Sequence, residues 1–324
     1  MPPVRAFVNS QLCAKLPIPA HSFANQTIIV TGSNIGMGLE AARHFVRLSA
    51  AKVILAVRTI SKGLTAKASI EDSTGRQGVV EVWELDQSSY ASVQAFAEKA
   101  KALERLDILV LNAGMYVFEF KKVEEDEETI TVNVVSTMLL ALTLLPKLRE
   151  TAAKTGGKSV LTFTGSFVHK DTSFPERKAP NIFEGLAKAK GARMSDRYNV
   201  SKLIETFCVR ELADKITESK SEGKVVANIL NPGFVDTAIM RNSSFLFSIY
   251  VLTMKKLLSR TTEEGGRTLV HGAEGGDETH GQYLDDCKVG RYSGFVLSEE
   301  GMETQKRLWS ELSEKLERIQ PGIM

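Results

Sequence analysis

The sequence predicts a single α/β domain built on a doubly wound, mostly parallel sheet with helices on both faces. Short apolar runs without polar alternation predict strands that are buried on both sides. Longer stretches of helical pattern separate these runs, and repeated strand–helix alternation favours a doubly wound sheet. The expected strands are Thr27–Val30, Val53–Val57, Val79–Glu84, Ile108–Leu111, Ser159–Phe163 and Val225–Leu230. The expected helices are Leu39–Ser49, Ser89–Leu103, Val132–Lys147 and Tyr198–Ile216.

Length and composition are those of an ordinary globular protein. The chain has 324 residues, enough for one large domain with a full hydrophobic core. Its 41 basic and 39 acidic residues nearly cancel, which gives no reason to expect a nucleic-acid partner. The three cysteines, Cys13, Cys208 and Cys287, lack metal-ligand spacing. We therefore expect no metal site and no disulfide, but inert thiols in a reducing compartment.

The two ends of the chain suggest additions to one domain. Residues 1–25 carry four prolines and are expected to form an arm laid over a domain that spans residues 26–324. Gly281–Leu284 fits a last strand, and Glu300–Ile319 a closing C-terminal helix. The arm has no apolar stretch of signal-peptide length, and Phe245–Leu258 is too short to cross a bilayer, which takes about 20 residues. A cytoplasmic protein without a membrane span is expected.

An acidic run, Glu124–Glu128, precedes one of the expected helices. Negative charge at a helix N-terminus complements the helix dipole. We expect this run to form a solvated face, and a metal site is the less favoured alternative.

A glycine-rich turn follows the first expected strand. Gly32, Gly36 and Gly38 let the backbone turn sharply and bring its N–H groups against a pyrophosphate at the start of a helix. Such turns often serve only as turns, but the position between strand and helix favours a dinucleotide. Ser33, Asn34 and Ile35 complete the loop and are included in the predicted cofactor site.

The residue after the second strand indicates which dinucleotide binds. An acidic side chain there would hold the adenosine ribose and favour NAD, whereas this chain has Arg58. Arginine can pair with a 2′-phosphate, and Lys62 can add a second positive charge. The alternative is an ordinary surface arginine. The sequence predicts NADP(H).

The leading Thr31 and the G-x-x-x-G-x-G spacing resemble the short-chain dehydrogenase/reductase family, which has a Rossmann fold. The resemblance implies that Asp86 contacts the adenine and that the N-A-G turn forms the floor of the cofactor groove. It also implies that the P-G-x-x-x-T segment lies beside the nicotinamide; Leu111 is a mild departure where many members have Asn. The residues that carry these roles here are Asp86, Asn112, Ala113, Gly114, Pro232, Gly233, Val235 and Thr237.

Tyr198 and Lys202 form the most specific motif in the chain. Residues four apart share one helix face, so both side chains point into one site. Tyrosine is a poor acid at neutral pH because its pKa is near 10, and a nearby ammonium lowers that pKa by stabilising the phenolate. The alternative is a tyrosine packed on the sheet beside an exposed lysine. The order of the motifs along the chain favours a catalytic role for this pair, and both residues are also expected to contact the cofactor.

Two further matches complete the expected site. Ser166, at the end of the fifth strand, can donate to a substrate carbonyl, and Gly165 stands where the family usually has another serine. Asn133 matches the helical Asn that holds a water in the family's proton relay. His169 lies near Ser166 in the sequence and is given no catalytic role.

The expected activity is NADPH-dependent reduction of a ketone or aldehyde on a hydrophobic small molecule, with Tyr198 as proton donor. The pattern is similar to fungal members related to retinol dehydrogenases, many of which act in natural-product pathways. Oxidation of a sterol-like or retinoid-like secondary alcohol, or a dinucleotide-sensing protein without redox chemistry, are alternatives. Insertions near residues 170–196 and 237–260 are expected to wall and cover the substrate; a helix packed on the core or on a partner is equally favoured for Phe245–Leu258. A homodimer is possible.

Overall fold

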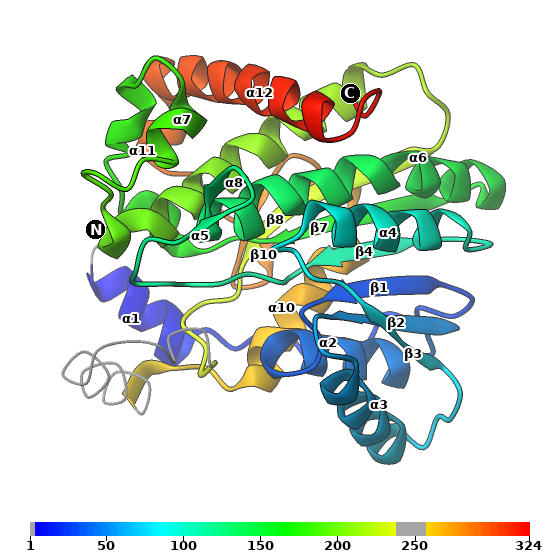
Figure 1. Cartoon of the computed structure of the whole chain (residues 1–324). Helices are drawn as coiled ribbons and strands as arrows, with labels where there is room; N and C mark the ends of the chain where they lie inside the picture. Colours follow the sequence, from blue (N-terminus) through cyan, green and yellow to red (C-terminus); the bar gives the residue numbers. More distant parts are fainter. Residues whose placement is uncertain (1–3, 238–256) are drawn as a thin grey trace.

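The protein is built on an eight-stranded sheet in the order β10-β9-β8-β7-β4-β1-β2-β3. The computed structural model describes residues 4–237 and 257–324 (Figure 1). All neighbouring strands pair in parallel except β10, which runs antiparallel to β9. The strands are β1 Thr27–Thr31, β2 Lys52–Val57, β3 Val80–Glu84, β4 Ile108–Leu111, β7 Lys158–Thr164, β8 Lys224–Asn231, β9 Tyr283–Asp285 and β10 Lys288–Val289. The predicted fold class and the six predicted parallel strands are confirmed.

Helices cover both faces of the sheet (Figure 1). Neighbouring residues of β4 contribute to different cores: Leu109 packs with the upper helices and Val110 with the lower ones. Both sides of a central strand are thus buried, which explains its unbroken apolar sequence. The upper helices in Figure 1 are α4 Tyr90–Lys101, α6 Thr137–Thr155, α8 Met194–Glu218 and α12 Glu299–Ile319; the lower ones are α2 Gly36–Arg47, α3 Ile60–Thr74 and α10 Thr262–Glu274.

The apolar helical stretch Glu128–Thr155 belongs to the core. It is long and apolar enough to cross a membrane, but 89% of its most apolar window is buried inside the fold. It runs through the short α5 Glu128–Ile130 and a π-helical turn, Thr131–Ser136, into α6. Its hydrophobicity is accounted for by packing between the sheet and the neighbouring helices.

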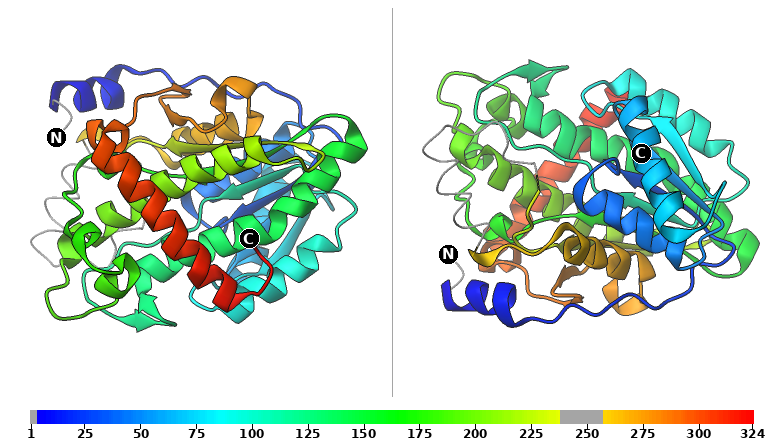
Figure 2. Two further views of the ribbon diagram at one scale, coloured as in Figure 1. Left: turned by 90° about the horizontal axis from the view of Figure 1, so that it is seen from above. Right: turned by 90° about the horizontal axis from the view of Figure 1, so that it is seen from below.

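The C-terminal helix α12 packs across α8 (Figure 2, left). Its apolar stripe, including Leu308, Trp309 and Leu312, joins the core cluster that contains the inner face of α8. This packing covers part of the outer surface of α8. Any homodimer that used that surface would have to include or displace α12.

The insertion at residues 170–196 is more ordered than a long loop. It contains a 3₁₀ turn, Pro175–Lys178, and α7 Ile182–Leu186, and its Phe174 is fully buried. Arg307 of α12 donates to the backbone carbonyls of Arg177, Ala179 and Pro180. These hydrogen bonds anchor the segment to α12. Its contribution to a substrate wall stays a prediction. Most of the expected lid, residues 238–256, lies outside the described residues.

The N-terminal segment contains a helix, α1 Val4–Cys13, which lies against loops at the carboxyl ends of the strands. Gln11 accepts a hydrogen bond from the backbone N–H of Phe234 at 3.0 Å. The buried Arg260 donates both to the Ser10 carbonyl, at 3.0 Å, and to the Pro232 carbonyl. Arg260 thus ties the N-terminal segment to the loop that follows β8.

The expectation of a solvated face at Glu124–Glu128 is confirmed for Glu124 and Glu125, which are exposed, but it is wrong for the two residues that follow. Asp126 and Glu127 are fully buried, in the two-residue strand β6 that pairs with β5 Lys122–Val123. The Lys315 ammonium of α12 lies 2.9 Å from a carboxylate oxygen of Asp126. The guanidinium of Arg197, also buried, lies 3.6 Å from Glu127. Cations from distant parts of the chain compensate these charges, which local sequence does not reveal.

Replacing Lys315 with alanine removes the cation that faces Asp126. Leaving one partner of a buried ion pair uncompensated costs about 3–5 kcal/mol. We expect Lys315→Ala to lower the free energy of unfolding by that amount in a urea titration. The control is Lys101→Ala, which removes an exposed pair with Glu98 worth at most about 1 kcal/mol. Equal losses of unfolding free energy in the two variants would contradict the assignment of Lys315 and Asp126 as a buried ion pair.

Candidate active site

The glycine turn between β1 and α2 has the geometry of an anion-binding loop. Gly32 and Gly36 adopt left-handed φ values of 64° and 65°, which glycine tolerates best. A Cβ atom on Gly38 would lie 2.6 Å from the side-chain nitrogen of Asn112, so any larger residue would collide. Among the described residues no side chain caps α2, whose N-cap is Ile35. The first N–H groups of this helix are therefore available to a phosphate.

A groove runs from this turn along the carboxyl ends of the strands. The predicted cofactor residues that line it are Gly32, Asn34, Ile35, Gly36, Gly38, Arg58, Lys62, Asp86, Asn112, Ala113, Gly114 and Thr237. Ser33 does not line it, because its buried hydroxyl donates to the Val30 carbonyl and closes the turn. The groove is thus bounded by the loops that follow four neighbouring strands, as expected at the switch point of a doubly wound sheet.

The segment after β8 lies beside the groove and is held by buried polar groups. Gly233 has a φ of 84°, and its N–H donates to the side-chain oxygen of Asn231. The buried Asn231 also accepts from the N–H of Phe167 after β7. Pro232 and Val235 do not line the groove, and Val235 instead bridges to Arg260. These predicted residues support the position of Thr237 at the groove.

Arg58 and Lys62 lie at the outer end of the groove. Both are exposed, and Arg58 directly follows β2. Among the described residues neither side chain forms an ion pair or hydrogen bond. Asp86, after β3, lines the same end and accepts from the Ser88 N–H at 2.9 Å. Two uncommitted cations therefore flank this end of the groove.

Tyr198 and Lys202 lie on one face of α8, as predicted. The Lys202 nitrogen is 5.8 Å from the centre of the Tyr198 ring. Burial raises the pKa of Tyr198, while the Lys202 charge and a hydrogen bond with Ser166 act to lower that pKa. The structure thus brings together the three side chains that the sequence singled out.

The Lys202 ammonium is held from two sides. It is only 4% exposed, and it donates to the Thr164 carbonyl and to the Glu205 carboxylate, each at 2.7 Å. Burial acts to lower the pKa of Lys202, but the charges of Glu205 and Tyr198 together raise this pKa. Sequence reasoning missed Glu205, although its spacing of three from Lys202 places it on the same helix face.

Asn133 links the two halves of the site from the π-helical turn. Its side-chain oxygen accepts from the Met115 N–H at 2.9 Å. Its side-chain nitrogen donates to the Met115 carbonyl and to the Ser201 hydroxyl. The side chain is fully buried, and these hydrogen bonds fix the loop after β4 against α8. A π-helical turn at such a place is frequent in functional sites.

Gly165 replaces the first of the two serines that the family usually shows, and packing explains why. A Cβ atom there would lie 2.7 Å from a side-chain carbon of Ile229. The Thr164 side chain points to no partner among the described residues, while its carbonyl receives Lys202. Of this segment, Ser166 is the side chain that reaches Tyr198.

Aromatic rings that the sequence analysis did not single out lie beside Tyr198. Tyr116 stacks on the Tyr198 ring with centres 4.9 Å apart, and Phe118 stacks on Tyr116 at 4.7 Å. Tyr116 also lines the groove. The site therefore has a flat, aromatic boundary next to the phenol.

His169 is a structural residue. It is 1% exposed, its Nδ1 lies 2.7 Å from the Ser166 carbonyl oxygen, and its ring contacts Tyr283 edge-on. Burial lowers the pKa of His169 to about 4, so the ring is neutral at physiological pH. Of the three cysteines, Cys208 and Cys287 are buried and Cys13 is exposed.

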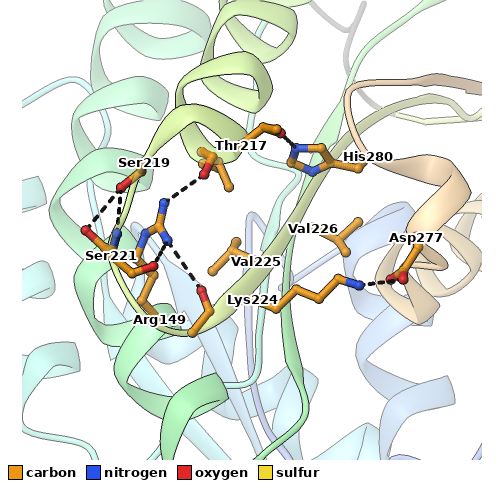
Figure 3. A pocket seen from close by; sticks show the side chains of 11 residues that line it. Arg149, Thr217, Ser219, Ser221, Lys224, Val225, Val226, Asp277 and His280 are labelled. Carbon is orange, nitrogen blue, oxygen red and sulfur yellow. Dashed lines mark hydrogen bonds and ion pairs between the residues drawn. The ribbon is translucent and has the colours of Figure 1, made fainter.

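A second hollow lies near the start of β8, at the amino ends of the strands (Figure 3). Its Arg149 donates to the carbonyls of Ile216, Ser221 and Gly223, and its Lys224 pairs with Asp277. The cations here are committed to internal partners. The polar side chains of this hollow therefore hold neighbouring segments of the fold together. The groove at the carboxyl ends of the strands is the candidate active site.

Comparison with known proteins agrees with this geometry. Residues 26–167 match the model of the short chain dehydrogenase family. The chain is 44% identical to the short chain dehydrogenase/reductase dmxR8 of Cryptosporiopsis sp. (strain 8999) over 98% of each chain. It is 46% identical to the short chain dehydrogenase atnD of Emericella nidulans, over 86% of this chain and 90% of that relative.

Solved structures share the fold at lower identity. A short chain dehydrogenase from Shigella flexneri 2a str. 301, complexed with NADP, is 24% identical with a TM-score of 0.57, over 83% of this chain and 99% of that one. An NADH-dependent reductase responsible for alginate metabolism is 20% identical with a TM-score of 0.58, over 81% and 96%. The near-full-length match to dmxR8, together with the family model, shows that the chain belongs to the short-chain dehydrogenase/reductase family of oxidoreductases.

Proposed function

We propose that this protein reduces a ketone or aldehyde group on a hydrophobic small molecule with NADPH. The observation that carries the proposal is the meeting of Tyr198, Lys202 and Ser166 beside a groove that starts at an uncapped helix N-terminus. The groove suits a pyrophosphate at one end and the polar triad suits a reacting carbonyl at the other.

The choice of NADPH rests on Arg58 and Lys62. Both cations are exposed at the groove, where a 2′-phosphate would receive charge-assisted hydrogen bonds. The NADP complex of the Shigella flexneri neighbour is in keeping with this choice, but an NADH-dependent reductase shares the same fold. The two basic side chains therefore support the proposal more than the neighbours do.

The residues of the site have complementary tasks in this reaction. Bound NADPH would supply a hydride to the carbonyl carbon. Ser166 orients the carbonyl by donating a hydrogen bond, and Tyr198 gives its proton to the oxygen as negative charge develops there. The Lys202 ammonium stabilises the phenolate that remains. Asn133 keeps the loop after β4 in register with α8.

The substrate is proposed to be flat and weakly polar, in the manner of a fungal secondary metabolite. The stacked rings of Tyr116 and Phe118 offer an apolar surface beside the phenol. The two relatives reported above are fungal proteins. A cytoplasmic location, with no nucleic-acid partner and no membrane span, is part of the same proposal, and a homodimer is compatible with it.

Purified protein mixed with NADPH and a panel of aromatic and aliphatic ketones and aldehydes tests the function. We expect carbonyl-dependent loss of NADPH absorbance, with aromatic ketones preferred. The reverse panel, secondary alcohols with NADP⁺, shows whether oxidation is faster. Tight NADPH binding without turnover on either panel would overturn the proposal and indicate a dinucleotide sensor.

Tyr198→Phe removes the proton donor and keeps the ring. General acid catalysis contributes about 10²–10⁴-fold, so kcat should fall by that factor while the Kd for NADPH changes little. The matched control is Tyr116→Phe, which loses the hydroxyl of the ring stacked on Tyr198. Turnover retained in Tyr198→Phe would refute the assignment.

Arg58→Asp exchanges a cation for an anion at the proposed phosphate end. Losing a charge-assisted hydrogen bond and adding repulsion should raise the KM for NADPH by about 10- to 100-fold. The KM for NADH should fall or stay constant, because the new carboxylate can accept from ribose hydroxyls. Arg291→Asp, at an exposed arginine that does not line the groove, controls for the change in net charge. An unchanged preference would mean that other residues select the cofactor.

A further inference from the structure

A buried carboxylate lies directly behind the proposed proton donor and its lysine. Glu205 is 2% exposed and sits one helical turn after Lys202 on α8. One of its oxygens accepts a hydrogen bond from the Lys202 ammonium at 2.7 Å. Within the described residues the Lys202 ammonium is the cation that this carboxylate contacts. Glu205 and Lys202 therefore form an isolated ion pair inside the core, in which burial raises the pKa of Glu205 while the charge and hydrogen bond of Lys202 act to lower that pKa.

A buried ion pair is often less stabilising than apolar packing, so its presence calls for a functional explanation. Moving a carboxylate from water into the interior costs several kcal/mol, and apolar residues of similar volume often stabilise a fold better. The neighbours on α8, Leu203, Ile204 and Phe207, are fully buried apolar residues, so another such side chain would suit the packing at position 205. The cost of a charge here suggests that Glu205 serves the chemistry of the site.

The hydrogen bonds of the Lys202 ammonium indicate what Glu205 does in the site. An ammonium has three N–H donors, and two of them are taken by the Thr164 carbonyl and the Glu205 carboxylate. These two acceptors hold the nitrogen in place and leave one donor for the site. A lysine side chain otherwise has much rotational freedom, which this arrangement removes before any ligand binds.

Glu205 also changes the charge that Tyr198 experiences. A lone ammonium near a phenol favours phenolate, which suits proton removal from an alcohol. A carboxylate behind the ammonium offsets part of that charge and favours the protonated phenol, which suits proton donation to a carbonyl. In agreement, the charge of Glu205 acts to raise the pKa of Tyr198, against the effect of Lys202.

We propose that Glu205 is a positioning residue of this site, which fixes the Lys202 ammonium and keeps Tyr198 protonated for reduction. The inference rests on the proposed function, since it concerns the direction in which the same site works best. It assigns to one side chain a preference for carbonyl reduction over alcohol oxidation.

In the part of the chain that the structure describes, few other charged groups face this cluster. Cys208, on the same helix, lies near Glu205, and its pKa is raised by burial. Tyr116, after β4, stacks on Tyr198, and burial raises the pKa of Tyr116, with Tyr198 and Asp196 acting in the same direction. β7 contributes the Thr164 carbonyl and the Ser166 hydroxyl, and the π-helical turn contributes Asn133; none of these titrates near neutral pH.

Glu205→Gln tests the inference, because glutamine keeps the shape and an acceptor oxygen but removes the charge. Reduction requires protonated Tyr198, so its rate is full below the pKa of that group and is lost above it. Removing the carboxylate should lower that pKa, and the alkaline limb of the kcat profile should move down by about one pH unit. The acidic limb of the kcat profile for alcohol oxidation should also move to lower pH. The ratio of the kcat for reduction to the kcat for oxidation should therefore fall at neutral pH.

Two controls separate charge from structure. Glu211→Gln makes the same change two turns later on α8, at a half-buried residue bonded to Gln305, and should leave both profiles unmoved. Glu205→Asp keeps the charge and should stay closer to wild type than Glu205→Gln. If the limbs of the kcat profiles of Glu205→Gln stay at the wild-type pH or move to higher pH, the proposal is overturned.

A readout without turnover distinguishes this inference from the proposed function. The ultraviolet difference absorbance of tyrosinate, with Tyr198→Phe as the blank, follows the ionisation of Tyr198 in the cofactor-free protein. It should move to lower pH in Glu205→Gln even if no substrate is found, and an unmoved titration would contradict the inference. If Glu205→Gln does not fold, neutron diffraction on the wild type decides: the proposal requires Glu205 without a proton and Tyr198 with one.

Discussion

The site depends on a single ammonium group held inside the protein. Lys202 is almost fully buried, and its charge is matched by the Glu205 carboxylate and the Thr164 carbonyl. Because α8 carries both Tyr198 and Lys202, the position of this nitrogen also fixes the phenol relative to the end of β7. The rest of the fold supports this point: the parallel sheet places the carboxyl ends of β7 and β1 on either side of β4, and Asn133 ties the loop after β4 to α8.

Much of this arrangement follows from local sequence. The central strands were predictable because they are short apolar runs that are buried on both faces, as β4 shows. The pairing of Tyr198 with Lys202 was predictable because helical periodicity places residues four apart on one face. The glycine turn was predictable for the same kind of reason, since Gly32 and Gly36 adopt φ values that other residues avoid.

What sequence reasoning missed depends on contacts between distant segments. Asp126 is buried because Lys315, 189 positions later, reaches it from α12, and nothing around Asp126 announces that partner. The ring of Tyr116 stacks on Tyr198 only once the loop after β4 meets α8. Glu205 is different: its spacing from Lys202 was visible, but a glutamate on a helix is usually solvated, and its burial became evident from the packing of α8.

The central claim is that the phenol of Tyr198 and the ammonium of Lys202 meet the reactive end of a dinucleotide that enters along the glycine turn. A crystal structure of the protein with NADPH tests it most directly. The account predicts the pyrophosphate at the N-terminus of α2, and the Tyr198 hydroxyl and one Lys202 N–H facing the nicotinamide end. A hydroxyl directed away from the bound dinucleotide, or a dinucleotide bound elsewhere while protein atoms fill this groove, would contradict the account.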